Sequence, residues 1–313
     1  MLKIFKNEVN QRVAVCSDFE KSSWIDLVNP TKEEIQRVSE VCQINSSVIL
    51  QVLVEKELPR VKKFDGGVLI VIDVPYMKDK NIKNKYVTYP LGIIICNSGF
   101  ILTVSLVEHE FLNKFKQGQV EDFDINKKVK FLIQIIFNSA SVYLQTLDLI
   151  EDDIQKVEKN TYHSTNNKQL INFLNIQKTL VYFITSLKSN GAVLERLQKE
   201  DVISLSKDEK VLLEDAVTEN KQCIETSMVS REILSSTIDA YGTIISNNLN
   251  VIVKFLTGIT IVFSVPTMIA SFIGMNVPLG IVGESEFSFL LICIVSLVVS
   301  FVLACWLKKK NML

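Results

Sequence analysis

"SFIGMNVPLG", residues 271–280, separates two long apolar runs near the end of the chain. The run before it, residues 251–273, carries Lys254 as its one charge, and the run after it, residues 287–307, carries none. Each run has about the length that a helix needs to cross ~30 Å of hydrocarbon. A soluble core has no evident use for a break of glycine, asparagine and proline between such runs. The pattern predicts a hairpin of two transmembrane helices with a functional connection.

The rest of the chain has the composition of a water-soluble body. It holds nearly all the charged residues in mixed sign, and the net charge of −1 gives no indication of a nucleic-acid partner. The first residues, "MLKIFKNEVNQRV", are too polar for the apolar core of a signal peptide. The basic residues Lys254, Lys308, Lys309 and Lys310 flank the two runs, whereas residues 274–286 contain no Lys or Arg. The positive-inside rule therefore predicts a multi-pass protein of the cell membrane with both termini in the cytoplasm.

Turn-rich and strand-like sequence comes first and helical sequence follows. "GGVLIVIDVPY" and "LGIIICNSGFILTVSL" are β-branched runs bounded by turn residues. "NPTKEEIQRVSEVCQI" reads as a helix capped by Thr31 and Glu34. After Gly118, apolar residues recur every three or four positions, with a break at "TYHSTNNK" and a second helix that ends near Gln198.

A third helix of unusual length is predicted after a capping box at Ser206 and Glu209. No proline follows until Pro266, so one helix of about 65 residues, ~100 Å at 1.5 Å per residue, enters the membrane without interruption. We therefore expect an α+β integral membrane protein. Its parts are a cytosolic α/β domain at 1–120, a cytosolic helical domain at 121–250 with a stalk from about 207, transmembrane helices at 251–273 and 287–307, an external loop at 274–286 and a basic tail at 308–313.

One side of the first transmembrane run is polar. Steps of three or four residues from Asp239 reach Asn250, Val253, Thr257, Thr260, Ser264, Thr267 and Ser271, which together we call the seam. In hydrocarbon a hydroxyl-bearing side must find protein or water. Spacing alone leaves two interpretations open: close helix association, or a water-filled pore formed by several copies of the chain. Continuation of the seam to Asn250 and Asp239 favours the pore.

The seam also indicates what such a pore would carry. Its groups within the membrane are neutral oxygen dipoles, which suit a hard cation that keeps its water. Mg²⁺ loses water reluctantly and prefers oxygen, so a ring of neutral acceptors is able to hold the hydrated ion through its waters.

Sequence features of an enzyme are weak by comparison. The six cysteines are widely separated and without a Cys-x-x-Cys pair, and His109 and His163 read as isolated surface or half-buried residues. The paired acids Asp152 and Asp153 read as a solvated helix face, and no Walker-type loop is present in the sequence. We expect no enzyme activity and no cofactor, with Mg²⁺ as the transported ion.

These features together resemble the CorA-type divalent cation transporters. The most specific match is the tripeptide Gly274-Met275-Asn276 at the outer end of the first of two C-terminal runs. Supporting matches are "WIDLVNPTKEE" at residues 24–34, "ELPRV" at 57–61, "LDLIEDDIQKVE" at 147–158 and "LKKK" at 307–310. The resemblance covers essentially the whole chain.

The resemblance implies a funnel-shaped homopentamer in the lipid bilayer, with a central pore lined by Asn250, Val253, Leu256, Thr260, Ser264, Thr267 and Ser271. It differs from the seam at one point, with Leu256 in place of Thr257. Gly274, Met275 and Asn276 would form the outer selectivity ring, with Asn276 facing the hydrated ion. Asp79 and Asp215 would bind regulatory Mg²⁺ between subunits, and Lys254 with Lys308 to Lys310 would form a basic collar.

Two rival functions remain. Within the same class, the cargo would be Zn²⁺, Co²⁺ or Ni²⁺ instead of Mg²⁺. The methionine of the tripeptide favours Mg²⁺, and Co²⁺ and Ni²⁺ are the further ions expected beside it. From another class, the chain would be a membrane-anchored coiled-coil scaffold without transport. Asn276→Ala separates the two classes, because only a pore would lose cation flux.

Overall fold

A computed structural model describes residues 1–7, 13–16, 18–78, 85–161, 167–199, 202–275 and 287–312. The chain divides into two compact units, Met1–Ser236 and Thr237–Leu313. Within the described ranges, the strands are β1 Leu2–Asn7, β2 Val13–Cys16, β3 Trp24–Val28, β4 Arg60–Phe64, β5 Gly67–Met77, β6 Tyr86–Cys96 and β7 Ile101–Ser105. The helices are α1 Lys32–Cys42, α2 Ser46–Val52, α3 Leu112–Lys116, α4 Lys128–Thr161, α5 Asn167–Gln198, α6 Lys207–Ile273 and α8 Ser288–Lys309.

The described strands form one sheet in the order β2-β1-β3-β7-β6-β5-β4. The β3–β7 pair is parallel, with Trp24 opposite Ile101, and the other pairs are antiparallel. The long hairpin of β5 and β6 keeps its register from Gly67 opposite Cys96 to Met77 opposite Tyr86. The predicted apolar runs thus form the centre of the sheet.

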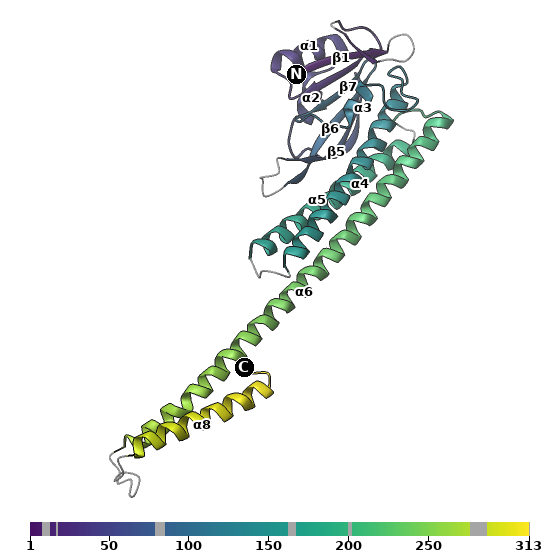
Figure 1. Cartoon of the computed structure of the whole chain (residues 1–313). Coiled ribbons are helices and arrows are strands. Elements are labelled where there is room, and N and C mark those ends of the chain that lie inside the picture. Colours follow the sequence, from purple (N-terminus) through teal and green to yellow (C-terminus); the bar gives the residue numbers. More distant parts are fainter. Residues whose placement is uncertain are drawn as a thin grey trace. The chain divides into compact units, whose positions relative to one another are not determined.

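Helices cover both faces of this sheet (Figure 1). Alternate residues of β5 point to opposite sides, so Leu69 and Val71 pack with α1 and α2, whereas Ile70 and Ile72 pack with the other core. That second core includes residues of α3, α4, α5 and the first part of α6, among them Phe115, Phe131, Leu194 and Leu213. An α/β region followed by long helices is therefore confirmed.

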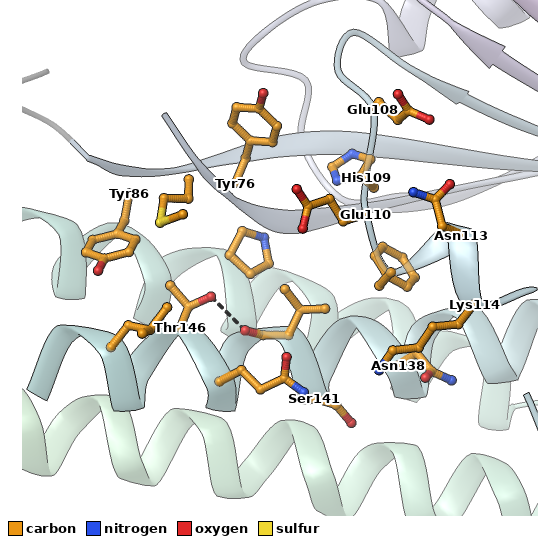
Figure 2. Close-up of a pocket in the computed structure, with 16 residues that line it drawn as sticks. Tyr76, Tyr86, Glu108, His109, Glu110, Asn113, Lys114, Asn138, Ser141 and Thr146 are labelled. Carbon is orange, nitrogen blue, oxygen red and sulfur yellow. Dashed lines mark hydrogen bonds between the residues drawn. The ribbon is translucent and has the colours of Figure 1, made fainter. Parts of the chain in front are cut away.

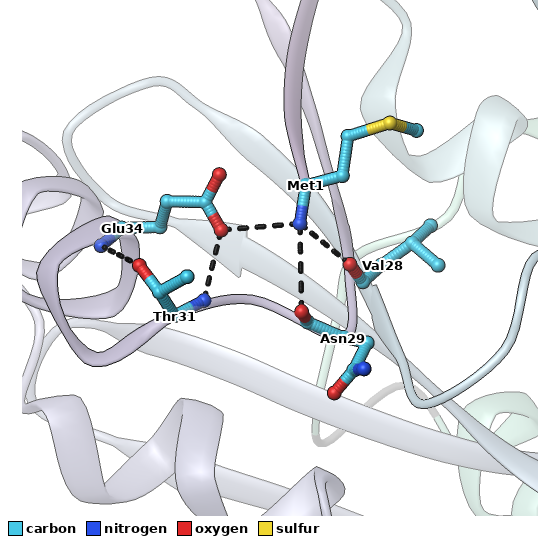
Figure 3. A network of polar contacts seen from close by, with 5 residues as sticks. All are labelled: Met1, Val28, Asn29, Thr31 and Glu34. Carbon is cyan, nitrogen blue, oxygen red and sulfur yellow. Dashed lines mark hydrogen bonds and ion pairs between the residues drawn. The ribbon is translucent and has the colours of Figure 1, made fainter.

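Both predicted capping boxes are present. Thr31 Oγ1 accepts from the Glu34 backbone N–H at 3.3 Å, and Glu34 Oε2 accepts from the Thr31 backbone N–H at 2.9 Å (Figure 3). The same carboxylate lies 3.1 Å from the Met1 amino group, which also donates to Val28 O at 2.7 Å. The start of α1 is thereby tied to β1 and β3. A matching pair of bonds joins Ser206 and Glu209 at the start of α6.

A side chain of α5 completes the edge of β5. β4 pairs with β5 only as far as Val71, so the next residues of β5 have no neighbouring strand on that side. There, Asn190 Oδ1 accepts from the Asp73 backbone N–H at 2.9 Å, and Asn190 Nδ2 donates to Asp73 O at 2.8 Å. Tyr143 of α4 and Ser186 of α5 donate to the same residue, at 3.2 Å and 2.6 Å. One carboxamide thus replaces a strand and fixes α5 on the sheet.

A buried ion pair links α3 to the centre of the sheet. Lys116 Nζ lies 2.7 Å from Asp26 Oδ2, and their side chains are 9% and 2% exposed. Thr103 donates to Asp26 Oδ1 at 2.7 Å and accepts from the Trp24 indole at 2.8 Å. The carboxylate is therefore paired and hydrogen-bonded, as a buried charge requires.

The second unit contains the rest of α6 and the whole of α8. Both helices are long and apolar enough to cross a membrane, and the candidate windows are only 6% and 17% buried in the molecule. Covered positions of α8 recur on one face: Ser296 and Ser300 are 8% exposed, and Leu307 is 2% exposed. The two C-terminal apolar helices predicted from the sequence are thus present.

Candidate functional site

All seam residues from Asp239 to Ser271 lie on α6 in the second unit. A helix turns about 100° per residue, so Asn250, Thr257, Ser264 and Ser271, spaced by seven, fall close to one line. Val253, Thr260 and Thr267 lie within about 60° of that line. All of these side chains are exposed in the unit.

The opposite side of α6 is the covered one. Gly258 is buried there, and the half-buried positions of this segment are Ile259, Val262, Val265, Pro266, Ile269 and Ile273. α8 runs beside this part of α6 (Figure 1), and we attribute the covering to it. The hairpin therefore covers its apolar side internally, and the hydroxyl-bearing side packs against no other helix among the described residues of this unit.

The hydroxyl groups of Thr257, Thr260, Ser264 and Thr267 share one hydrogen-bonding arrangement. Each of the four donates its proton to a main-chain carbonyl one turn earlier: Thr257 to Val253 and Thr260 to Leu256 at 2.8 Å, Ser264 to Ile261 at 2.8 Å and Thr267 to Phe263 at 2.9 Å. A hydroxyl has one proton and two lone pairs. Once the proton is used, the group presents only acceptor oxygen to whatever lies beside the helix.

Helical spacing predicts Thr257 as a pore-lining residue, whereas the family resemblance implies Leu256, and the geometry of α6 bears on this choice. Thr257 lies about 20° from the line through Ser264, whereas Leu256 lies about 80° from it. Leu256 is 62% exposed and Val253, itself a seam residue, is 58% exposed, so apolar side chains lie in and beside the N-terminal part of the seam. The pore-lining role of these positions stays a prediction.

Only part of the predicted selectivity tripeptide is described. The Gly274 backbone N–H donates to Ala270 O at 2.9 Å and closes the last turn of α6, and Met275 is 54% exposed. Asn276 lies outside the described residues. The glycine is thus placed where the helix ends, as expected, while the predicted asparagine ring has no structural test.

The predicted regulatory and basic positions are exposed where they are described. Asp215 is exposed on α6 in the first unit, whereas Asp79 lies outside the described residues. Within the described ranges, no group of three or more His, Cys, Asp or Glu residues is arranged to hold a metal. Lys254, Lys308, Lys309 and Lys310 are exposed in the second unit.

A separate cavity of about 650 Å³ lies in the first unit, between the end of β5, α3 and α4 (Figure 2). His109 lines it and is 3% exposed, so the expectation of a surface or half-buried histidine was wrong. Burial lowers the pKa of His109 to about 4, and the nearby Lys116 ammonium acts in the same direction. The imidazole is neutral at physiological pH. It belongs to this interior and is far in sequence from the seam.

Comparison with known proteins identifies the scaffold. A family model described as CorA-like Mg²⁺ transporter protein matches residues 19–309. The chain belongs to the CorA family.

Two CorA relatives are named cobalt/magnesium transport protein. That of Methanocaldococcus jannaschii is 29% identical over 257 residues, covering 81% of this chain and 79% of the relative. That of Thermotoga maritima is 21% identical over 316 residues, covering 99% and 88%.

The solved structure of a CorA protein matches along the whole chain. The complete CorA magnesium transporter from Methanocaldococcus jannaschii aligns with a TM-score of 0.85 at 24% identity, covering 100% of this chain and 99% of that one. The shared fold is a soluble part, a long helix and two apolar C-terminal helices. Membership of the CorA family makes the chain a divalent cation transporter, and its two apolar helices are consistent with a membrane protein.

Proposed function

We propose that this CorA-family protein takes up Mg²⁺ through a pore formed by the α6 seams of five copies. A divalent ion gains about 4.6 kcal/mol per 100 mV of membrane potential, so uptake into a negative interior needs no ATP. Both termini face the cytoplasm in this proposal, with Lys254 and Lys308 to Lys310 at the inner surface. Asn276 receives the hydrated ion outside.

The observation that carries the proposal is the acceptor-only character of the seam. The water molecules around a cation turn their hydrogens outward, and they need acceptors rather than donors. The hydroxyls of Thr257, Thr260, Ser264 and Thr267 have already spent their protons on the helix backbone. A pore lined by such acceptor oxygens suits Mg²⁺, which keeps its first water shell, better than an ion that must lose its water to pass.

Regulation by cytosolic Mg²⁺ is part of the same proposal. Asp79 and Asp215 would take the ion between neighbouring copies and favour the closed arrangement, because a ligand shifts a population only toward the state that it binds better. A scaffold without transport predicts no such dependence.

Flux through the purified full chain in proteoliposomes tests the transport proposal. Vesicles with an imposed negative interior and a Mg²⁺-sensitive dye should show uptake that Asn276→Ala abolishes. Unchanged uptake in that variant would contradict the pore. Co²⁺ is the second cargo to measure, because the two relatives are named for cobalt as well as magnesium. A strong Zn²⁺ flux with negligible Mg²⁺ flux would overturn the choice of ion.

Aqueous access tests the seam itself. In a background without the native cysteines, single cysteines at Thr260, Ser264 and Thr267 should react with a membrane-impermeant thiol reagent. Cysteines at Val262 and Ile269, at similar depth on the covered side, serve as matched controls and should not react. Equal reactivity of both sets, or reaction only with lipid-soluble reagents, would contradict a hydrated seam.

A further inference from the structure

The cavity of the first unit is lined by both apolar and polar side chains (Figure 2). Its volume of about 650 Å³ is typical of small-molecule sites, which combine a mostly apolar lining with a few polar groups. The apolar residues that line it are Pro75, Met77, Phe111, Val142 and Leu149. A molecule in this cavity would therefore contact hydrocarbon and polar groups at the same time.

The charged lining includes one unpaired carboxylate and one unpaired ammonium. Glu108 Oε1 lies 3.7 Å from Lys116 Nζ, so its charge is balanced within the protein. Glu110 and Lys114 are exposed, and neither forms an ion pair with the other or with any residue that the structure describes. Their backbone is fixed by the turn at the start of α3, where the Lys114 N–H donates to Phe111 O at 3.2 Å. The cavity thus offers one negative and one positive group to a ligand.

Uncharged polar groups complete the lining. Asn138 Nδ2 donates to Gln134 O at 2.8 Å, and Asn113 and Gln145 add two further carboxamides. His109 is 3% exposed, and its Nε2 has no hydrogen-bond partner in the described part of the chain. Buried polar atoms normally have a partner, so the lining retains hydrogen-bonding capacity. In the same described residues no three His, Cys, Asp or Glu side chains are arranged to hold a metal, so a metal ion does not suit this cavity.

We propose that this cavity binds a free amino acid with an apolar side chain. The ammonium of the ligand pairs with Glu110, its carboxylate pairs with Lys114, and its side chain lies against apolar residues such as Met77 and Leu149. A ligand with a single charge would leave Glu110 or Lys114 unmatched, whereas a zwitterion satisfies both. The proposal concerns the first unit and does not depend on transport.

Equilibrium dialysis of the full chain in detergent with labelled L-leucine tests the site. Isoamylamine has the leucine side chain without the carboxylate, and isocaproate has it without the ammonium. Leucine should bind saturably, and each analogue should compete about tenfold more weakly than unlabelled leucine, because one charge-assisted contact is lost. Labelled methionine and phenylalanine extend the test to other apolar side chains. Absence of saturable binding for all three amino acids, or equal competition by either analogue, would overturn the proposal.

Three charge-removing variants separate this cavity from other binding sites. Glu110→Gln and Lys114→Gln should each weaken leucine binding about tenfold, because each removes one of the unpaired charges. Glu108→Gln removes a carboxylate that is already paired in the same lining, and it should leave binding within about twofold. All three side chains are exposed, and the Tm of each variant without ligand verifies its folding. Wild-type affinity in Glu110→Gln would contradict the assignment.

Hydrogen exchange shows where leucine binds. The backbone amides of Leu112, Asn113 and Lys114 donate to the carbonyls of residues 109–111 and should exchange more slowly when leucine is present. Protection confined to other segments would also overturn the proposal. These measurements need no ion flux, so a failure of the transport proposal and a failure of the amino-acid site are distinguishable.

Discussion

Thr260→Val removes one acceptor from each seam and little else. Valine has nearly the shape of threonine, and the lost bond, Thr260 Oγ1 to Leu256 O at 2.8 Å, is not a bond of the helix backbone. A hydrogen bond that includes an ordered water contributes about 1 kcal/mol net. If a hydrated ion contacts two of the five hydroxyls at a time, the barrier at this level rises by ~2 kcal/mol. The Mg²⁺ uptake rate should then fall about thirtyfold.

The assay is the initial rate of Mg²⁺ uptake at a fixed membrane potential, divided by the amount of protein inserted in the vesicles. Thr260→Ser keeps the hydroxyl and should stay within about twofold of the wild type, which separates loss of the acceptor from a change of packing. An uptake rate for Thr260→Val within that same range would refute the reasoning, because the hydroxyl would then take no part in passage of the ion.

Three further predictions concern the first unit of the full chain in detergent. Asp73→Asn should raise Tm at neutral pH but not near pH 4. Burial raises the pKa of Asp73, so the folded state binds the proton more tightly than the unfolded state does. The wild type therefore loses stability as the pH rises through this raised pKa, and asparagine, which carries no charge, does not. An equal effect at both pH values would contradict this sign. Lys116→Met should destabilise the protein by about 3 kcal/mol in chemical unfolding, because Asp26 would stay buried without its cation. Gly92→Ala should cost about 1–3 kcal/mol, since the new methyl would lie 2.5 Å from Val52 Cγ2, and an unchanged Tm would show that α2 moves freely.

Local signals in the sequence predicted much of the fold. The capping boxes at Thr31 and Ser206 depend on residues three positions apart, so the chain itself displays them. The two C-terminal helices follow from composition over about 20 residues. The hydroxyl line of α6 follows from helical periodicity, and the structure adds which side is covered and where each hydroxyl proton goes.

Contacts between distant residues were not predictable in the same way. Asp153 lies in an acidic stretch that reads as solvated, yet it accepts a hydrogen bond from Lys85, which reaches it only because the sheet brings β6 against α4. His109 stands between two glutamates, so its neighbours in the sequence give no sign of its burial. Asp73 offered the one usable signal, a lone acid within the apolar run "GGVLIVIDVPY", but its partner Asn190 lies 117 positions further along.

The direction of the seam hydroxyl protons has a consequence for ions of the opposite sign. Water molecules around chloride or phosphate turn their oxygens outward, so they need hydrogen-bond donors from the wall of a pore. The hydroxyls of Thr257, Thr260, Ser264 and Thr267 already donate to the helix backbone and have no proton left to offer. A wall of this kind would reject anions by the orientation of their hydration water, without any fixed charge. No group on these four residues titrates, so this discrimination should persist when the pH outside the cell changes.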